Sequence, residues 1–156
     1  MRFILISWLA LVADQVSKYI IYTNMMPGES IPVFPPVFYI TYVLNPGAAF
    51  GMLAHRTNFF ILVSFLVIIG VMAGYRYLPR ERTWIHNALG LVVGGALGNL
   101  VDRIRLGRVV DFLDFRVWPV FNLADTAIVI GALLLIIDVW RSDKEGKKRM
   151  DTGAEE

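Results

Sequence analysis

The sequence of 156 residues has no cysteine, only two histidines, and charged residues at only 18% of its positions. The absence of cysteine excludes disulfide bonds, thiolate metal sites and a cysteine nucleophile. The histidines, His55 and His86, fall on opposite sides of the membrane in the topology derived below, so we expect no histidine cluster for a transition metal. We therefore expect a protein that works without a cofactor.

The scarcity of charge accompanies long apolar runs, which a soluble domain of this length does not show. Hydrophobic residues make up 56% of the chain, and four runs approach the roughly 20 residues that cross about 30 Å of hydrocarbon. The sequence predicts a mainly α-helical membrane protein with four transmembrane helices, at about residues 3–22, 59–78, 84–101 and 121–140. Asp14 and Lys18 interrupt the first run and no small-residue cleavage site follows, so we expect it to be retained rather than cleaved as a signal peptide.

Basic residues are distributed unevenly between the two sides of these spans. With the amino terminus inside, nine lie on the inner side and five on the outer side, which favours cytoplasmic amino and carboxyl termini. The inner set is Arg2, Arg76, Arg80, Arg82, Arg141, Lys144, Lys147, Lys148 and Arg149, and the outer set is Arg56, Arg103, Arg105, Arg108 and Arg116. We expect residues 1–141 to form one integral-membrane domain, followed by a charged, disordered cytoplasmic tail over 142–156.

The segment between the first two spans, about residues 23–57, is extracytoplasmic in this topology. Pro27, Pro32, Pro35 and Pro36 exclude a helix through its first half. The stretch 37–44, VFYITYVL, is aromatic and β-branched, as a strand should be. We expect a small sheet on the membrane surface, because open strand edges cannot lie in lipid. The alternative is a disordered loop, which the aromatic content disfavours.

Four aspartates lie inside or at the edges of the apolar runs, where an ionised carboxylate is costly and is usually retained for a function. They are Asp14, Asp102, Asp111 and Asp125. The topology places all four at one depth, near the boundary of the outer leaflet. Asp138 lies instead at the inner end of the fourth span, where we expect it to pair with Arg141, three residues away.

Two of these aspartates have a structural explanation as good as a functional one. Asp14 and Lys18 are spaced i, i+4 with the acid first, the favourable order for an ion pair within a helix. They could neutralise each other or present a charged face to the interior of the bundle. Asn99, Asp102 and Arg103 share a helix face, and an arginine beside an aspartate fits a structural clamp at least as well as a catalytic acid.

Glycines recur every four residues in the third span, at Gly90, Gly94 and Gly98. This spacing lets another helix approach closely. We interpret it as packing, with no chemical role.

Asp111 and Asp125 have no basic residue at a helical spacing that would clearly pair them. Asp125 falls in the first turn of a helix, where the helix dipole favours negative charge and Asn122 could be the N-cap, so a purely structural role is open. Two carboxylates at close range share one proton, because both cannot ionise cheaply. Such a pair can take a proton from water and give one to a carbonyl oxygen, which is aspartic-protease chemistry. Asp114 lies in a polar segment, and we expect it to be solvated.

Five blocks in this order resemble the lipoprotein signal peptidases, the signal peptidase II family of bacteria. They are DQVSK at 14–18, NPGAAF at 45–50, GGALGNLVDR at 94–103, VVDF at 109–112 and FNLAD at 121–125. The resemblance implies four membrane spans, with a β-cradle and a short outer helix between the first two. It also implies an aspartyl endopeptidase that cuts the signal peptide from prolipoproteins before a diacylglyceryl-modified cysteine.

The resemblance further implies roles for individual residues. Asp111 and Asp125 would be the catalytic pair, with Asp102 as the residue to substitute in the pair if this assignment fails. The supporting and substrate-binding positions would be Asp14, Lys18, Asn45, Gly47, Asn99, Asp102, Arg103, Asn122 and Ala124. The expected partners are a prolipoprotein with a diacylglyceryl-cysteine, membrane lipid and inhibitors such as the cyclic peptide globomycin, with no nucleic acid. The expected location is the bacterial cytoplasmic (inner) membrane, with the active site near the outer leaflet.

Other classes of protein are less consistent with the sequence. Ser17 and Lys18 could suggest a serine–lysine protease, but adjacent helical residues point about 100° apart and do not form a dyad. A small proton or ion carrier would also keep intramembrane Asp and Lys. However, these carboxylates gather at one depth instead of forming a path across the membrane, and no internal repeat is visible. A purely structural membrane protein would explain the glycines but not the clustered carboxylates.

Overall fold

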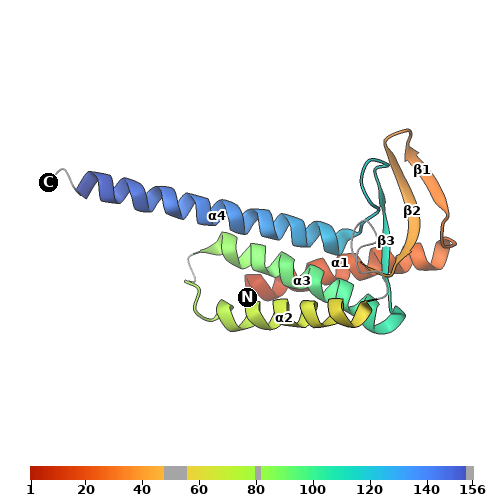
Figure 1. Ribbon diagram of the computed structural model, residues 1–156, viewed down its shortest axis with the longest axis horizontal. Coiled ribbons are helices and arrows are strands. Elements are labelled where there is room, and N and C mark those ends of the chain that lie inside the picture. Colours follow the sequence, from red (N-terminus) through yellow and green to blue (C-terminus); the bar gives the residue numbers. More distant parts are fainter. Residues whose placement is uncertain (48–55, 80–81, 154–156) are drawn as a thin grey trace.

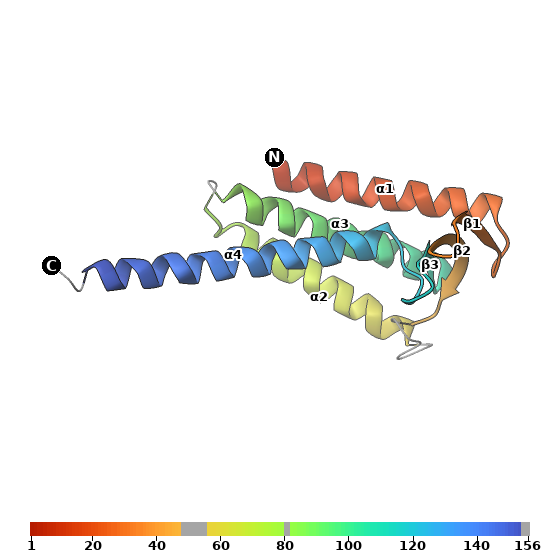
Figure 2. The ribbon, with the colours of Figure 1, turned by 90° about the horizontal axis from the view of Figure 1, so that it is seen from above.

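Four helices run along the molecule, and a small sheet lies across one end of them (Figures 1 and 2). The computed structural model describes residues 1–47, 56–79 and 82–153. Within these residues the helices are α1 (Arg2–Asn24), α2 (Thr57–Tyr75), α3 (Thr83–Leu106) and α4 (Leu123–Gly153). Each contains a stretch long and apolar enough to cross a membrane. The prediction of four spans is therefore confirmed.

The helices begin and end a few residues from the predicted bounds. α3 continues five residues past the predicted end, to Leu106, and stops at Gly107, whose φ of 70° is a left-handed C-cap. The backbone of α4 stays helical to Gly153, through the segment for which the sequence predicts disorder, so the boundary at residue 141 stays a prediction.

α3 is the central helix and packs against α1, α2 and α4. α2 has no buried residue and is apolar along its length, so its surface suits contact with lipid. The hydroxyl of Thr57 donates to the carbonyl of Gly107 at 2.8 Å, which joins the start of α2 to the end of α3.

Glycines allow α3 to contact two helices at once, as the spacing predicted. A Cβ atom on Gly94 would collide with the backbone of Ser7 in α1, and one on Gly95 would collide with the carbonyl of Ala124 in α4. A Cβ on Gly98 would collide with the carboxylate of Asp14. These positions therefore have no room for a side chain.

The sheet has three antiparallel strands in the order β1 (Ser30–Phe34), β2 (Phe38–Asn45) and β3 (Val109–Asp114). The predicted strand at 37–44 is β2, shifted by one residue. β3 comes from the connection between α3 and α4, and its pairing with β2 sets Asp111 opposite Val43. The short outer helix expected between the first two spans is not found in residues 25–47, and residues 48–55 lie outside the described residues.

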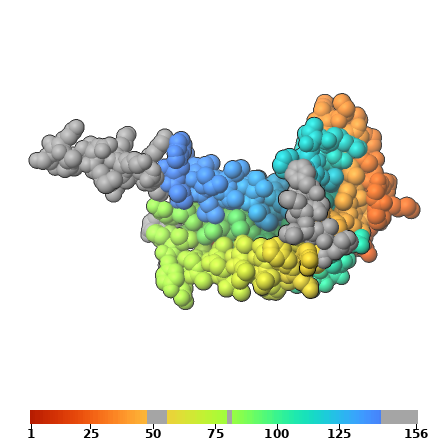
Figure 3. Space-filling model, in the orientation of Figure 1, coloured from red at the N-terminus to blue at the C-terminus, as the bar shows by residue number. Residues whose placement is uncertain are grey.

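The sheet is attached to the bundle through a small apolar core. Ile21 and Met25, at the end of α1, pack with Tyr42 of β2 and with Val110 and Phe112 of β3. Figure 3 shows the strands and the 109–121 segment standing together at one end of the helices. This attachment places the ends of β2 and β3 next to the start of α4.

Two predictions about aspartates are wrong. Asp138 pairs with Arg82, the residue before α3, at 3.3 Å, instead of with Arg141. Asp114 is buried, because it ends β3 and accepts hydrogen bonds from the hydroxyl of Thr41 and the backbone N–H of Arg116. Both errors arise because partners from distant parts of the chain cannot be found from local spacing.

Replacing Gly98 by alanine should destabilise the protein by about 1–3 kcal/mol, because the added methyl group needs space that the Asp14 carboxylate occupies. The midpoint of thermal unfolding in detergent measures the effect. Gly70→Ala in α2 is the matched control, since nothing lies within 4 Å of its added Cβ and its midpoint should not fall. Equal midpoints for the two variants would contradict the close approach of α1 and α3.

Candidate active site

Asp111 lies in β3 and is nearly inaccessible, with 2% of its surface exposed. One carboxylate oxygen accepts a hydrogen bond from the Asn45 side chain at 2.8 Å, and the other accepts one from the Asn122 side chain at 2.6 Å. Burial and the nearby charge of Asp125 raise the pKa of Asp111 to about 7, although these two hydrogen bonds act in the opposite direction. This carboxyl group therefore holds a proton more readily than an ordinary aspartate.

Asp125 lies in the first turn of α4, as the sequence predicted. Its backbone N–H donates to the side-chain oxygen of Asn122 at 2.9 Å, so Asn122 is the N-cap of the helix. The side-chain amide of Asn99, in α3, donates to the Asp125 carboxylate at 2.7 Å. Asn122 therefore contacts both aspartates, one through its amide nitrogen and the other through its amide oxygen.

The two aspartates line one cavity of about 300 Å³ at the junction of β2, β3, α3 and α4. Arg103 and Gly47 also line it, and the Arg103 guanidinium lies 4.9 Å from the centre of the Phe60 ring. The expected clamp between Arg103 and Asp102 is not formed among the described residues. The full lining is Asn45, Gly47, Asn99, Arg103, Val109, Asp111, Trp118, Pro119, Val120, Phe121, Asp125 and Val129.

A second, apolar cavity of about 460 Å³ adjoins the first along α4. The two share Trp118, Phe121, Asp125 and Val129. Its remaining lining consists of Phe115, Thr126 and Ile130. An apolar surface thus leads directly to the Asp125 carboxylate. Sequence reasoning missed the aromatic residues here, and only their position between β3 and α4 could have indicated them.

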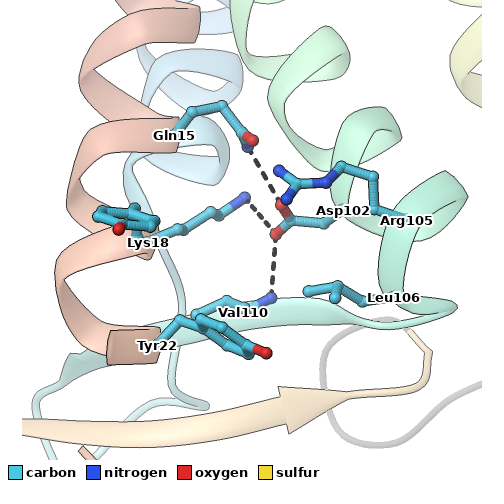
Figure 4. Close-up of a pocket in the computed structure, with 8 residues that line it drawn as sticks. Gln15, Lys18, Tyr22, Asp102, Arg105, Leu106 and Val110 are labelled. Carbon is cyan, nitrogen blue, oxygen red and sulfur yellow. Dashed lines mark hydrogen bonds and ion pairs between the residues drawn. The ribbon is translucent and has the colours of Figure 1, made fainter. Parts of the chain in front are cut away.

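Asp14, Lys18 and Asp102 form a compact ionic cluster next to Asn99, which lines the polar cavity. Figure 4 shows the Lys18 ammonium facing the Asp102 carboxylate. The Lys18 ammonium lies 2.9 Å from the Asp14 carboxylate and 3.0 Å from that of Asp102. Asp14 also accepts the backbone N–H of Ala124 at 2.9 Å, and Asp102 accepts that of Val110 at 3.1 Å. Both interpretations of the Asp14–Lys18 pair thus hold in part, because the pair is an intrahelical salt bridge and also faces the interior.

Gln15 belongs to the same cluster, and the sequence analysis missed it. Its side-chain nitrogen lies 3.1 Å from Asp102, 3.2 Å from Asp14 and 3.1 Å from the carbonyl of Gly98. The signal available was its position next to Asp14 and three residues before Lys18. Asp102 points into this cluster and does not line the cavity of Asp111 and Asp125. Its geometry does not support it as a substitute in the pair.

Three asparagines are oriented in the same way around the two aspartates. The side-chain oxygen of each asparagine accepts a hydrogen bond. The donor is the backbone N–H of Gly47 for Asn45, the Lys18 ammonium for Asn99, and the backbone N–H of Asp125 for Asn122. Each amide nitrogen is therefore turned toward a carboxylate of the pair. Lys18 thus acts on Asp125 through Asn99, without touching it.

The fold and the site define a class of protein: an integral-membrane aspartic peptidase, a hydrolase of peptide bonds. The family described as signal peptidase (SPase) II matches residues 6–141. The chain belongs to the signal peptidase II family, and the resemblance seen in its five sequence blocks is confirmed.

Curated relatives and solved structures agree with this assignment. The lipoprotein signal peptidase of Moorella thermoacetica is 57% identical over 86% of this chain and 90% of its own. The lipoprotein signal peptidase of Pelotomaculum thermopropionicum is 54% identical over 94% of this chain and 96% of its own. A bacterial membrane enzyme structure at 2.3 Å resolution superposes with a TM-score of 0.87 at 35% identity, covering 92% of this chain and 90% of the other. A second bacterial membrane enzyme structure, at 1.9 Å resolution, superposes with a TM-score of 0.81 at 37% identity, covering 88% of this chain and 91% of the other.

Replacing Lys18 by methionine should destabilise the protein by about 3–5 kcal/mol, because two buried carboxylates lose the cation that they share. Asp138→Asn breaks an exposed ion pair and should cost less than about 1 kcal/mol. Thermal unfolding of the two variants in detergent gives the comparison. Similar small losses for both would show that the buried cluster contributes little.

Proposed function

We propose that Asp111 and Asp125 are the catalytic pair of an endopeptidase that removes the signal peptide from diacylglyceryl-modified prolipoproteins. The cut falls before the lipid-modified cysteine. The observation that carries this proposal is that two carboxylates from different elements line one cavity and are joined through Asn122. Family membership favours this function over the proton or ion carrier considered from the sequence.

The reaction needs one proton shared between the two aspartates. Asp111 holds it, in keeping with its raised pKa of about 7. Asp125 takes a proton from a water molecule whose oxygen attacks the carbonyl carbon, while Asp111 gives its proton to the carbonyl oxygen. The tetrahedral intermediate then returns a hydroxyl proton to Asp111, and Asp125 protonates the departing nitrogen as the carbon–nitrogen bond breaks. Both aspartates end in their starting states.

The surroundings of the pair suit a substrate that is partly lipid. The apolar cavity beside Asp125 can hold apolar side chains of the signal peptide, and the acyl chains stay in the bilayer. Arg103 supplies a cation that can hold a backbone carbonyl of the substrate at the polar cavity. Inhibitors of the globomycin type would occupy the same two cavities. Residues 1–141 act as one peptidase domain.

We further propose that the protein lies in the bacterial inner membrane with both termini in the cytoplasm. The excess of basic residues on that side supports this orientation. The sheet and the catalytic pair, at the other end of the bundle, then lie at the outer leaflet, where secreted prolipoproteins present their cleavage site.

Asp111→Asn and Asp125→Asn should each lower cleavage of a diacylglyceryl-modified prolipoprotein by at least about 10³-fold, because each removes a general acid–base group. Purified protein in detergent, with a chelator present, is the system to use. Asp102→Asn is the control, and it should weaken cleavage far less. Full loss with Asp102→Asn and survival of Asp111→Asn would move the catalytic role to α3.

The rate should fall on the alkaline side as the shared proton is lost. Asp111 is protonated below its pKa of about 7 and ionised above it, so kcat/KM should decline as pH rises through this value. Asn45→Ala removes a hydrogen bond that lowers this pKa, and should move the decline to higher pH. Asn24→Ala, at the exposed end of α1, should leave the pH profile unchanged. A shift to lower pH in Asn45→Ala would contradict the assignment of the proton to Asp111.

A further inference from the structure

A cavity of about 750 Å³ opens at the end of the helical bundle opposite the sheet (Figures 1 and 2). It lies where α1 begins, α2 ends and α3 begins. Arg2 comes from the first of these, Tyr75 and Arg76 from the second, and Thr83 and His86 from the third. The proposed peptidase chemistry makes no use of it, because the catalytic pair lies at the other end of α3.

Contacts between aromatic rings join the three helices at this cavity. The rings of Phe3 and Tyr75 are 4.4 Å apart, and those of Tyr75 and His86 meet edge to face at 5.2 Å. Phe3 and His86 are both buried. Packed aromatic rings from three helices therefore form the base of the cavity, so it is more than a gap between helix ends.

The lining of the cavity is basic. Arg2 and Arg76 contribute two positive charges, and none of the described lining residues is acidic. Arg76 contacts only the hydroxyl and ring of Tyr77 among the described residues, and these contacts leave its charge uncompensated. Arg82, the N-cap residue of α3, differs because it is paired with Asp138.

The start of α3 adds to the positive potential. No side chain caps this end, and no acidic residue lies in the first turn. The first backbone N–H groups of a helix have no partner within it and carry the positive end of the helix dipole. Thr83 and His86, which belong to this turn, line the cavity. Two arginines and a helix start thus converge on one space that favours an anion.

We propose that this cavity binds the phosphate of an anionic glycerophospholipid. Basic pockets between transmembrane helices are suited to such headgroups. Exposed large apolar side chains lie within about one helical turn of the lining residues along the chain, Ile4 and Leu5 after Arg2 in α1 and Met72 before Arg76 in α2, and acyl chains would cover them. Free phosphate would leave this surface bare, which is why the ligand is assigned as a lipid. The assignment of the lipid to the inner leaflet rests on the orientation proposed above. The binding of the lipid to the cavity does not depend on that orientation.

Native mass spectrometry of the delipidated full-length protein, with added phosphatidylglycerol or phosphatidylcholine, tests the proposal. The wild type should retain phosphatidylglycerol about 25-fold better than phosphatidylcholine, since each of the two arginines near an anionic headgroup contributes about fivefold. The double variant Arg2→Gln, Arg76→Gln should lose this preference. Arg141→Gln, an exposed arginine at the same end of the bundle, should keep it. Equal retention of both lipids by the wild type, or an unchanged preference in the double variant, would overturn the proposal.

Thr83→Glu provides a second variant that does not depend on the double variant folding. A carboxylate in the first turn should stabilise α3 through the helix dipole and, at the same time, repel a phosphate. We expect an unchanged or higher unfolding midpoint together with loss of the lipid preference. Displacement of phosphatidylglycerol by an equal concentration of inorganic phosphate would identify a simple anion site and refute the lipid assignment. Prolipoprotein cleavage in detergent should be normal in all these variants, so that a failure here is distinct from a failure of the proposed function.

Discussion

The ammonium group of Lys18, held between two buried carboxylates, is the interaction on which the rest of the structure depends. It bridges Asp14 of α1 and Asp102 of α3. Asp14 also accepts a backbone N–H from the first turn of α4, and Asp102 accepts one from β3. A buried ion pair is tolerated only when its remaining hydrogen-bonding capacity is satisfied. α1, α3, α4 and β3 must therefore meet in one arrangement. This arrangement places Asp111 and Asp125 in a shared cavity.

The protein places two pairs of aspartates in opposite electrostatic environments. Asp14 and Asp102 share the ammonium of Lys18, which forms an ion pair with both buried carboxylates. Asp111 and Asp125 are surrounded mainly by neutral amides, and the Arg103 guanidinium lines their cavity without an ion pair to either among the described residues. Amides donate hydrogen bonds but do not cancel charge, so burial and the neighbouring Asp125 raise the pKa of Asp111 to about 7. Asn99 links the lysine-bound pair to the proposed catalytic pair, because its side chain contacts Lys18 on one side and Asp125 on the other.

Sequence reasoning succeeded where a local rule decides the outcome. The apolar runs predicted the four helices, the glycine spacing predicted close packing of α3, and Asn122 at the start of an acidic first turn predicted the N-cap. It failed for Asp114 and Asp138, whose partners are Thr41 and Arg82, and it overlooked Gln15. In each case the deciding contact joins residues far apart in the chain. Local spacing carries no information about such contacts.

The sequence by itself determined the membrane-spanning character, the four helices, the β2 strand and the set of intramembrane carboxylates. These follow from the hydrocarbon thickness, the 3.6-residue period of a helix and the cost of charge in lipid. Only the tertiary structure decided which carboxylates are neutralised and which face an open cavity. Asp102 and Asp111 are nine residues apart, yet one points at Lys18 and the other at a cavity shared with Asp125. The physical reason is that the electrostatic state of a buried carboxylate depends on the groups within a few ångströms of it, and those groups come from four separate segments of the chain.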